Sequence, residues 1–403
     1  MKKHTLDNGL RLVYEYRESN VTSFCIGFDA GAIMEEGYKL GTAHAVEHML
    51  FKGTKTKNEY EINKLCDEIF GFNNAMTNYP YCIYYGTTLN EDFCKGFELY
   101  SDIILNPTFP KEGFKEEIDI ILEELIEWRD DLEQYCEDML FYNAFKQRRI
   151  KNLIIGTEES IKSITLQDIK NFYNEFYSPD NCVISVVSSL SFDEVINEVS
   201  NIYEKWDKKF QKKELKLYEK NNSGIFSNKR EGLNGSKIQI IFPIHELMES
   251  ELYALYLFNL SFGEGTSSLL YDYVRTKNGL VYDIKSTIKY EKGIKLFSIY
   301  LGTSVQNTEN ALKLVQEIIE NVKNDKSYFG TEKIKRNSKR IKIKRELEIE
   351  RSIVLSKNMT TNEIMFNNCD LFIDEALVNV SEEEIYDVIN KVLVNPAIQI
   401  VRM

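Results

Sequence analysis

Long apolar runs are absent from this 403-residue sequence, since no stretch approaches the roughly 18 apolar residues that a membrane-crossing helix needs. No apolar segment follows Met1-Lys2-Lys3, so we expect no secretory signal. The seven cysteines form no Cys-x-x-Cys pair, which favours reduced thiols and a cytoplasmic protein over a disulfide scaffold. None has a histidine nearby in the sequence, so the pattern does not support a cysteine nucleophile.

Positive charge is also in deficit. The formal net charge is −13 and the pI is about 5.1, which argues against nucleic acid as a partner. The exception is a basic run from Lys333 to Arg345, in which lysines and arginines occur with no acid between them. Such a run can form an anion-binding or peptide-guiding surface, but more often it is the solvated face of a helix.

Histidine is scarce too, and two of the four histidines lie four residues apart in His44-x-x-Glu47-His48. On a helix these three side chains fall within about 100° of one another, while Thr42 is placed to cap the helix and Gly53 to end it. Neutral imidazoles suit Zn²⁺, and a catalytic zinc keeps three protein ligands and one water. Glu47 would then accept a proton from that water. The alternative is two surface histidines on a helix.

A third ligand is expected on a long amphipathic segment, residues 112–145, whose apolar residues recur at helical spacing. Most acids of this segment project from the polar face. Glu117 and Glu124 instead lie seven residues apart at the apolar edge, where a carboxylate needs a partner. This favours Glu117 or Glu124 over Glu123 as a metal ligand, although both could be boundary residues that reach water.

The order His-x-x-Glu-His is the inverted zincin motif. Together with the segments around it, this motif resembles that of the family of pitrilysin, insulin-degrading enzyme and mitochondrial processing peptidase. The resemblance covers nearly the whole chain. The other matching segments are Thr5–Leu12, Gly41–Thr54, Gly71–Thr77 with its Asn-Ala-x-Thr sequence, and the pair Glu117-x6-Glu124.

The resemblance assigns a role to each residue of the motif. It implies that His44, His48 and Glu124 bind one Zn²⁺ per chain. Glu47 would be the catalytic base, and Glu117 would be a supporting acid behind the ligands.

Peptide-binding residues are implied in the same way. Asn74 and Ala75 would lie on an edge strand that holds the substrate backbone. In the C-terminal half, a glycine-rich loop, Gly263–Ser268, precedes Arg275 and Tyr282, which resemble the family's Arg-x6-Tyr pair. These two side chains would stabilise negative charge on the substrate carbonyl oxygen. The alternative is a surface cation and a tyrosine that packs in a core.

The chain reads as two similar halves. Residues 1–210 and 231–403 each run from a strand through helices and further strands to a late strand, and the charged segment 211–230 is a predicted linker. Strands and helices without strict alternation favour an α+β fold. The resemblance implies two α/β-sandwich domains, each a mixed, largely antiparallel sheet packed with helices. The first domain would bind zinc, and the second would be a related copy that acts on the substrate and binds no metal.

These observations predict a zinc metalloendopeptidase that hydrolyses peptides or unfolded presequence-like segments. The resemblance implies a chamber formed by two subunits, as a homodimer or as a heterodimer with a related subunit. One alternative is a non-catalytic or partner-dependent peptide-binding subunit of a heterodimeric peptide-maturation protease. Another is a zinc hydrolase for a non-peptide substrate.

Overall fold

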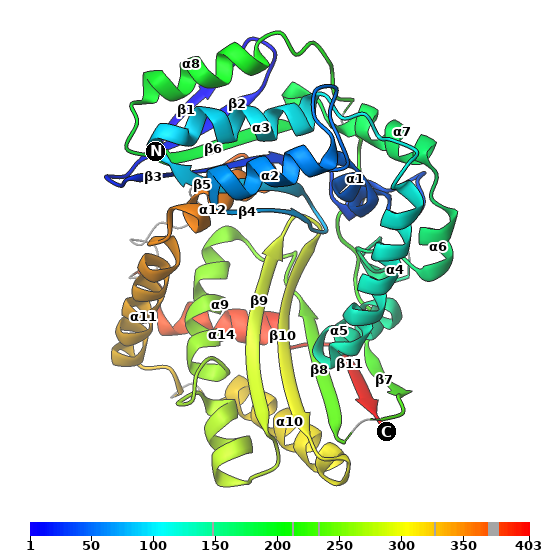
Figure 1. Cartoon of the computed structure of the whole chain (residues 1–403). Helices are drawn as coiled ribbons and strands as arrows, with labels where there is room; N and C mark the ends of the chain where they lie inside the picture. The colour runs from blue at the N-terminus through cyan, green and yellow to red at the C-terminus, as the bar shows by residue number, and fades with distance from the viewer. Residues whose placement is uncertain (147–148, 212, 233, 326–327, 370–378) are drawn as a thin grey trace. The chain divides into compact units, whose positions relative to one another are not determined.

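The computed structural model describes residues 1–146, 149–211, 213–232, 234–325, 328–369 and 379–403 (Figure 1). These residues form two compact units. Unit 1 holds the described residues within 1–126, 152–215 and 346–371, and unit 2 holds those within 127–151, 216–345 and 372–403. Each unit therefore contains a segment from the other half of the sequence. No helix among the described residues is long and apolar enough to cross a membrane.

Unit 1 is built on a six-stranded sheet in the order β1-β2-β6-β3-β5-β4. All neighbouring strands are antiparallel except β2 and β6, which are parallel. The strands are β1 (Lys2–Thr5), β2 (Arg11–Tyr16), β3 (Val21–Phe28), β4 (Phe70–Thr77), β5 (Cys82–Leu89) and β6 (Cys182–Ser188). The central strand β3 is buried along almost its whole length, whereas β4 lies at an edge.

Helices pack on both faces of this sheet. The helices of unit 1 are α1 (Thr42–Leu50), α2 (Glu59–Ile69), α3 (Phe93–Leu105), α4 (Phe114–Asp130, which runs into unit 2), α6 (Glu158–Ser163), α7 (Leu166–Phe176), α8 (Phe192–Tyr203) and α12 (Ser352–Phe366). On one face, Phe24 of β3 packs edge-on against Phe97 of α3, with ring centroids 5.4 Å apart. On the other face, Gly27 of β3 lies so close to Thr360 of α12 that a Cβ would be 2.5 Å from its methyl group.

The helix α12 reaches the sheet of unit 1 from late in the sequence. Met359 packs into an apolar cluster with residues of β3, β5 and β6. Hydroxyl groups also cross this contact, since Ser185 of β6 lies 2.7 Å from both Ser356 Oγ and Thr360 Oγ1. Buried hydroxyls that are partnered in this way do not carry the cost of an unpaired polar group.

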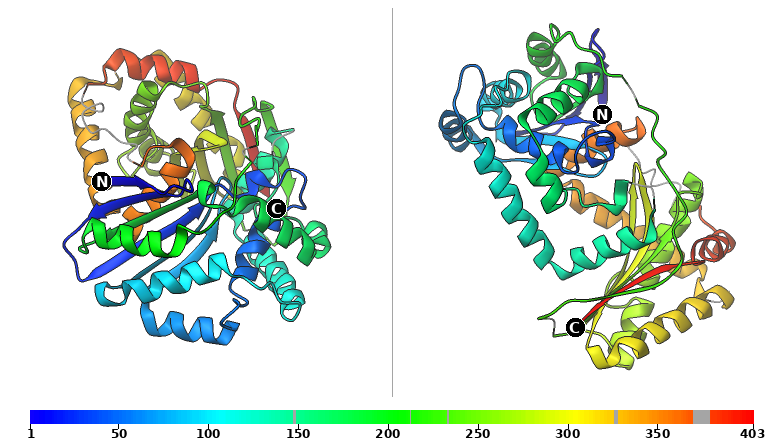
Figure 2. Two further views of the ribbon diagram at one scale, coloured as in Figure 1. Left: turned by 90° about the horizontal axis from the view of Figure 1, so that it is seen from above. Right: turned by 90° about the vertical axis from the view of Figure 1, so that its right-hand side faces the viewer.

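Unit 2 has a five-stranded sheet in the order β7-β11-β8-β10-β9, with β7 and β11 as its one parallel pair. The strands are β7 (Gly224–Lys229), β8 (Ser236–Pro243), β9 (Asp283–Glu291), β10 (Ile294–Thr303) and β11 (Ala397–Arg402). The helices are α5 (Leu132–Ala144), α9 (Glu249–Phe262), α10 (Thr308–Asn324), α11 (Thr331–Ile349) and α14 (Glu382–Val392), and a π-helix spans Tyr271–Lys277. The main core of unit 2 includes Phe258 of α9, Phe297 of β10 and Ile389 of α14. Figure 2 gives two further views of the chain.

The predicted fold class, α+β with two mixed and largely antiparallel sheets, is confirmed. The predicted division at 1–210, 211–230 and 231–403 differs from the units observed. The end of the linker is the strand β7, because residues 224–229 pair with β11; residue 212 of that linker lies outside the described residues. The segment 112–145 is two helices, because the Asp131 side chain accepts hydrogen bonds from Glu133 N and Gln134 N and starts α5.

Candidate metal centre

The helix α1 presents the two histidines of the motif. Ala43, Val46 and Leu50 are fully buried, so the opposite side of the helix is left for His44 and His48. The predicted N-cap, Thr42, is wrong. It is the first helical residue, and its hydroxyl donates to Lys39 O, while Gly41 occupies the N-cap position with a φ of 88°.

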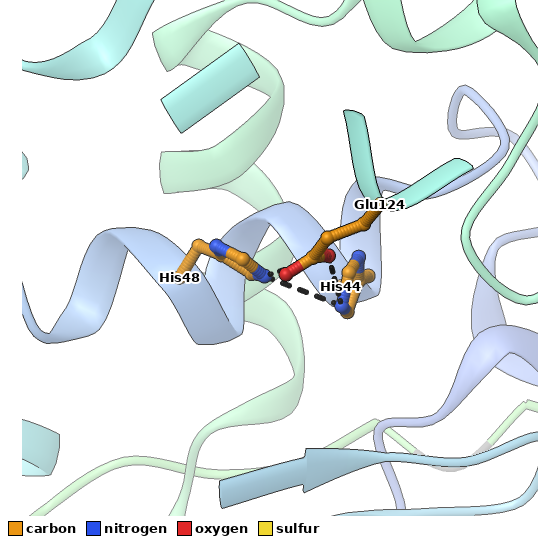
Figure 3. Close-up of side chains that lie close together, drawn as sticks. All are labelled: His44, His48 and Glu124. Atoms are coloured by element: carbon orange, nitrogen blue, oxygen red, sulfur yellow. Dashed lines mark hydrogen bonds and ion pairs between the residues drawn. The ribbon is translucent and has the colours of Figure 1, made fainter. Parts of the chain in front are cut away.

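The helix α4 brings the third donor to the histidines (Figure 3). His44 Nε2 lies 3.3 Å from His48 Nε2, and Glu124 Oε2 lies 3.7 Å from the first and 3.5 Å from the second. Among the described residues this is the one group of three such side chains whose potential ligand atoms lie within 4.8 Å of one another. Of the two glutamates left open by periodicity, Glu124 is therefore the one that meets both Nε2 atoms.

The spacing of these donors fits a tetrahedral zinc. Zinc–ligand bonds of about 2.0–2.1 Å at tetrahedral angles place neighbouring ligand atoms about 3.4 Å apart. The three observed separations, 3.3, 3.5 and 3.7 Å, bracket that value. Two imidazoles and one carboxylate are also the donor set of several catalytic zinc sites.

Glu117 supports the second histidine. Its Oε2 lies 2.9 Å from His48 Nδ1, and its Oε1 lies 3.0 Å from Nζ of Lys52, a lysine whose side chain is only 7% exposed. Lys52 also pairs with Glu59 Oε1 at 2.8 Å. A hydrogen bond at Nδ1 fixes the imidazole tautomer and leaves Nε2 for a metal. The sequence placed Glu117 beside the ligands, but it did not reveal that Lys52 stands behind it.

The two histidines differ in their protonation. Burial lowers the pKa of His44 to about 4, helped by the neighbouring His48. Burial alone would also lower the pKa of His48, but hydrogen bonds to Glu117 and Glu124 raise it to about 9. Metal ligation requires neutral imidazoles, so His44 is already in the required form and His48 would release a proton.

Glu47 is a half-buried carboxylate beside the histidines. Burial raises its pKa to about 6, although a hydrogen bond from the Thr77 hydroxyl to Oε2 lowers it. Thr77 ends β4 and contacts Cys82 Sγ at 3.4 Å. Because the pKa lies below 7, Glu47 is mostly ionised at neutral pH and can accept a proton. The sequence predicted Glu47, but it did not indicate that Thr77 orients it.

The strand that carries Asn74 and Ala75 is the edge strand β4, which pairs with β5 alone among the described strands. Asn74 is exposed, and its Oδ1 accepts from Ala75 N at 2.8 Å. The helix α1 packs against β4. An unpaired strand edge beside a candidate metal site can bind an extended peptide by adding it as a further strand.

Arg275 and Tyr282 belong to unit 2, whereas the three candidate metal ligands belong to unit 1. The Arg275 guanidinium lies 4.8 Å from the centroid of the Tyr271 ring and donates to its hydroxyl. Tyr282 is 65% exposed, so it is not packed in a core. Nearby in the sequence, Glu264 of the glycine-rich loop pairs with Lys344, and its carbonyl accepts from Arg340. Part of the basic run therefore holds this loop.

Comparison with known proteins now identifies the family. A model described as "Insulinase (Peptidase family M16)" matches residues 11–158, and one described as "Peptidase M16 inactive domain" matches residues 163–339. The chain belongs to peptidase family M16. The metal group lies within the first M16 match, and His245 is the only histidine within the second.

Curated relatives and solved structures agree with the M16 assignment. The chain is 28% identical over 327 residues to the "Uncharacterized zinc protease YmxG" of Bacillus subtilis, covering 81% of this chain and 79% of the relative. It is 28% identical over 238 residues to the "Probable mitochondrial-processing peptidase subunit beta, mitochondrial" of Arabidopsis thaliana, covering 59% and 43%. The crystal structure of a protease from Helicobacter pylori has a TM-score of 0.90 at 20% identity, with 100% and 99% of the chains covered. That likeness shows the fold.

Proposed function

We propose that this chain is a zinc-dependent endopeptidase in which His44, His48 and Glu124 bind the metal. The convergence of three donor atoms at the spacing of tetrahedral zinc carries the proposal. The printed names of two relatives, both "Uncharacterized zinc protease", support it. When bound, zinc supplies Lewis acidity that lowers the pKa of water and polarises a carbonyl group.

Glu47 is the proposed general base. It takes a proton from the attacking water as the oxygen bonds to the peptide carbonyl carbon, and it returns that proton to the amine as the carbon–nitrogen bond breaks. Its partial burial limits its contact with bulk water, and the Thr77 hydroxyl donates a hydrogen bond to one carboxylate oxygen. Glu117 holds His48 in the tautomer that a ligand needs.

The peptide would bind in extended form along β4. Asn74 and Ala75 lie on that edge, where backbone groups of a peptide can complete the ladder. Arg275 and Tyr282 would stabilise the charge that develops on the carbonyl oxygen, consistent with their exposure. Recognition through backbone atoms predicts weak sequence specificity and a preference for unfolded segments.

A two-subunit chamber is part of this proposal, as a homodimer or as a heterodimer with a related subunit. A second candidate is a subunit that needs a partner for activity, and the observation that favours it is the word "subunit" in the name of the Arabidopsis relative. Zinc binding without cleavage by the isolated chain would favour this second candidate.

The test compares wild type with Glu47→Gln for metal content and for cleavage of a mixed library of unstructured peptides. Both proteins should hold one zinc per chain, and Glu47→Gln should cleave about 10²–10⁴-fold more slowly. Glu123→Gln, a change at an exposed acid of α4, is the matched control. Equal cleavage by wild type and Glu47→Gln would rule out the assigned base, and a wild type without zinc would rule out the metalloenzyme.

A further inference from the structure

The first turn of α1 has no side-chain cap of its own. The N-cap is Gly41, and a Cβ at this position would lie 2.2 Å from Ile155 O, so no larger residue fits. The cap comes instead from Glu35, six residues earlier. Glu35 Oε2 accepts from Gly41 N at 3.1 Å, and Oε1 accepts from Ala43 N at 2.9 Å. One carboxylate thus holds two backbone amides next to His44.

Glu35 is almost fully buried, at 2% exposed. A buried carboxylate is costly unless hydrogen bonds satisfy it, and a helix N-terminus provides both donors and favourable partial charge. Its neighbour Glu36 is exposed. Of these two acids, Glu35 is therefore the one that caps the helix.

The segment that carries Glu35 is itself attached to the turn that follows β4. Ala32 N donates to Asn78 O at 3.1 Å, and Ile33 N donates to Tyr79 O at 2.8 Å. Residues 32–35 are therefore hydrogen-bonded at one end to the turn after β4 and at the other end, through Glu35, to the first turn of α1.

His44 depends on this backbone arrangement more than His48 does. His48 has Glu117 at Nδ1, whereas His44 Nδ1 is buried without a hydrogen-bond partner among the described residues. Within the part of the chain that the structure describes, no side chain hydrogen-bonds to Nδ1 to fix the direction of the His44 ring. Its place is set by the helix backbone on which it sits, and Ala43, the residue before it, is held by Glu35.

We propose that Glu35 is a positioning residue that fixes His44 relative to the β4 edge. This inference rests on the proposed function, because it takes His44 as a ligand and β4 as the peptide strand. Glu35 would contact neither metal nor peptide. It would keep the metal donors and the bound peptide backbone in register, so its loss would affect metal affinity and turnover more than peptide binding.

The test uses the full-length protein with Glu35→Gln, and with Glu36→Gln as the matched control at the exposed neighbour. Glu35→Gln keeps the size of the side chain but loses its charge and one good acceptor. Zinc affinity is measured by titration against a chromophoric chelator, and the thermal midpoint of the metal-free protein is measured in parallel. We expect Glu35→Gln to bind zinc about tenfold more weakly, with a lower kcat and an unchanged KM.

The outcomes separate the inference from the function on which it rests. If Glu35→Gln lowers the thermal midpoint but binds zinc like wild type, Glu35 is merely structural and the inference fails. Equal zinc weakening in Glu36→Gln would also overturn it, since that carboxylate does not reach the helix. If wild type binds zinc but cleaves no peptide, the proposed function fails, and the zinc titration alone decides the role of Glu35.

Discussion

Glu117 accepts a hydrogen bond from Nδ1 of His48 at 2.9 Å. Its other oxygen forms an ion pair with the nearly buried Lys52, so Glu117 links the histidine to the lysine. Hydrogen bonds and ion pairs to His48 and Lys52 hold the pKa of Glu117 below its usual range despite burial. Glu117 is therefore a fixed anion, able to hold one tautomer of His48.

Replacing Lys52 with methionine should weaken zinc binding, because Glu117 would lose the cation that orients it. We expect zinc affinity to fall about tenfold and the free energy of unfolding to fall by about 1–3 kcal/mol, since two carboxylates lose a charged partner. Chelator competition and urea denaturation measure the two effects. Lys55→Met, which removes an exposed hydrogen bond to Asn106, is the control. Equal zinc affinity in both variants would exclude this role for Lys52.

Replacing Glu124 with alanine should remove a ligand, whereas Glu123→Ala should not. Glu124 Oε2 lies within 3.7 Å of both histidine Nε2 atoms, while Glu123 is exposed on the same helix. Loss of one of three ligands should leave less than one zinc per chain after dialysis, which elemental analysis measures. A larger loss of zinc in Glu123→Ala than in Glu124→Ala would show that Glu123, and not Glu124, faces the two histidines.

Replacing Thr77 with valine should slow turnover without releasing zinc. The Thr77 hydroxyl donates to Glu47 Oε2, and valine has the same shape but no donor. Losing one hydrogen bond to a charged group, worth about 1.5 kcal/mol, corresponds to about a tenfold lower kcat. Thr77→Ser keeps the hydroxyl and should stay close to wild type. If valine and serine behave alike, the hydrogen bond does not orient the base.

Asp138 should make unit 2 less stable as the pH rises. Burial raises its pKa from 3.8 to about 6, against the hydrogen bond that Trp128 Nε1 donates at 2.8 Å. Because the folded pKa is the higher one, the contribution of Asp138 to stability is complete below about pH 4 and is lost as the pH rises through about 6. Two pKa units correspond to at most about 2.7 kcal/mol, which partial exposure reduces to about 1–2 kcal/mol.

At pH 7 the free energy of unfolding of Asp138→Asn should therefore be about 1–2 kcal/mol higher than that of wild type. Between pH 4 and 6 it should also depend less on pH. Urea denaturation followed by tryptophan fluorescence measures this. Asp119→Asn, at an exposed position of α4, is the control. A wild-type stability that rises between pH 4 and 6, with no difference in Asp138→Asn, would contradict the prediction.

The periodicity of residues 112–145 already separated Glu117 and Glu124 from the solvent-facing acids. Glu117 is 7% exposed, as expected for a carboxylate at an apolar edge. Periodicity could not choose between them, because that choice depends on where α4 crosses α1. The family resemblance favoured Glu124, and Glu124 Oε2 lies 3.7 Å from His44 Nε2 and 3.5 Å from His48 Nε2.

Other features had no signal in the sequence. Glu35 and Glu36 are chemically identical neighbours, and only the path of the loop decides which is buried against α1. The packing of α12 on the sheet of unit 1 could not be predicted from the sequence either. Its buried face includes Ser356 and Thr360, so hydrophobic periodicity does not mark the side that packs on β3 and β6.

The docking of α12 on the first sheet has a consequence for the order of events during synthesis. A ribosome has finished every strand of that sheet and both helices of the candidate metal centre long before it reaches Ser352. Until α12 emerges, Gly27 is not covered by Thr360 and Ile364, and this face of the sheet stays open. The nascent chain therefore carries all three candidate zinc ligands on an incomplete core, which can close only once residues 352–366 have been made.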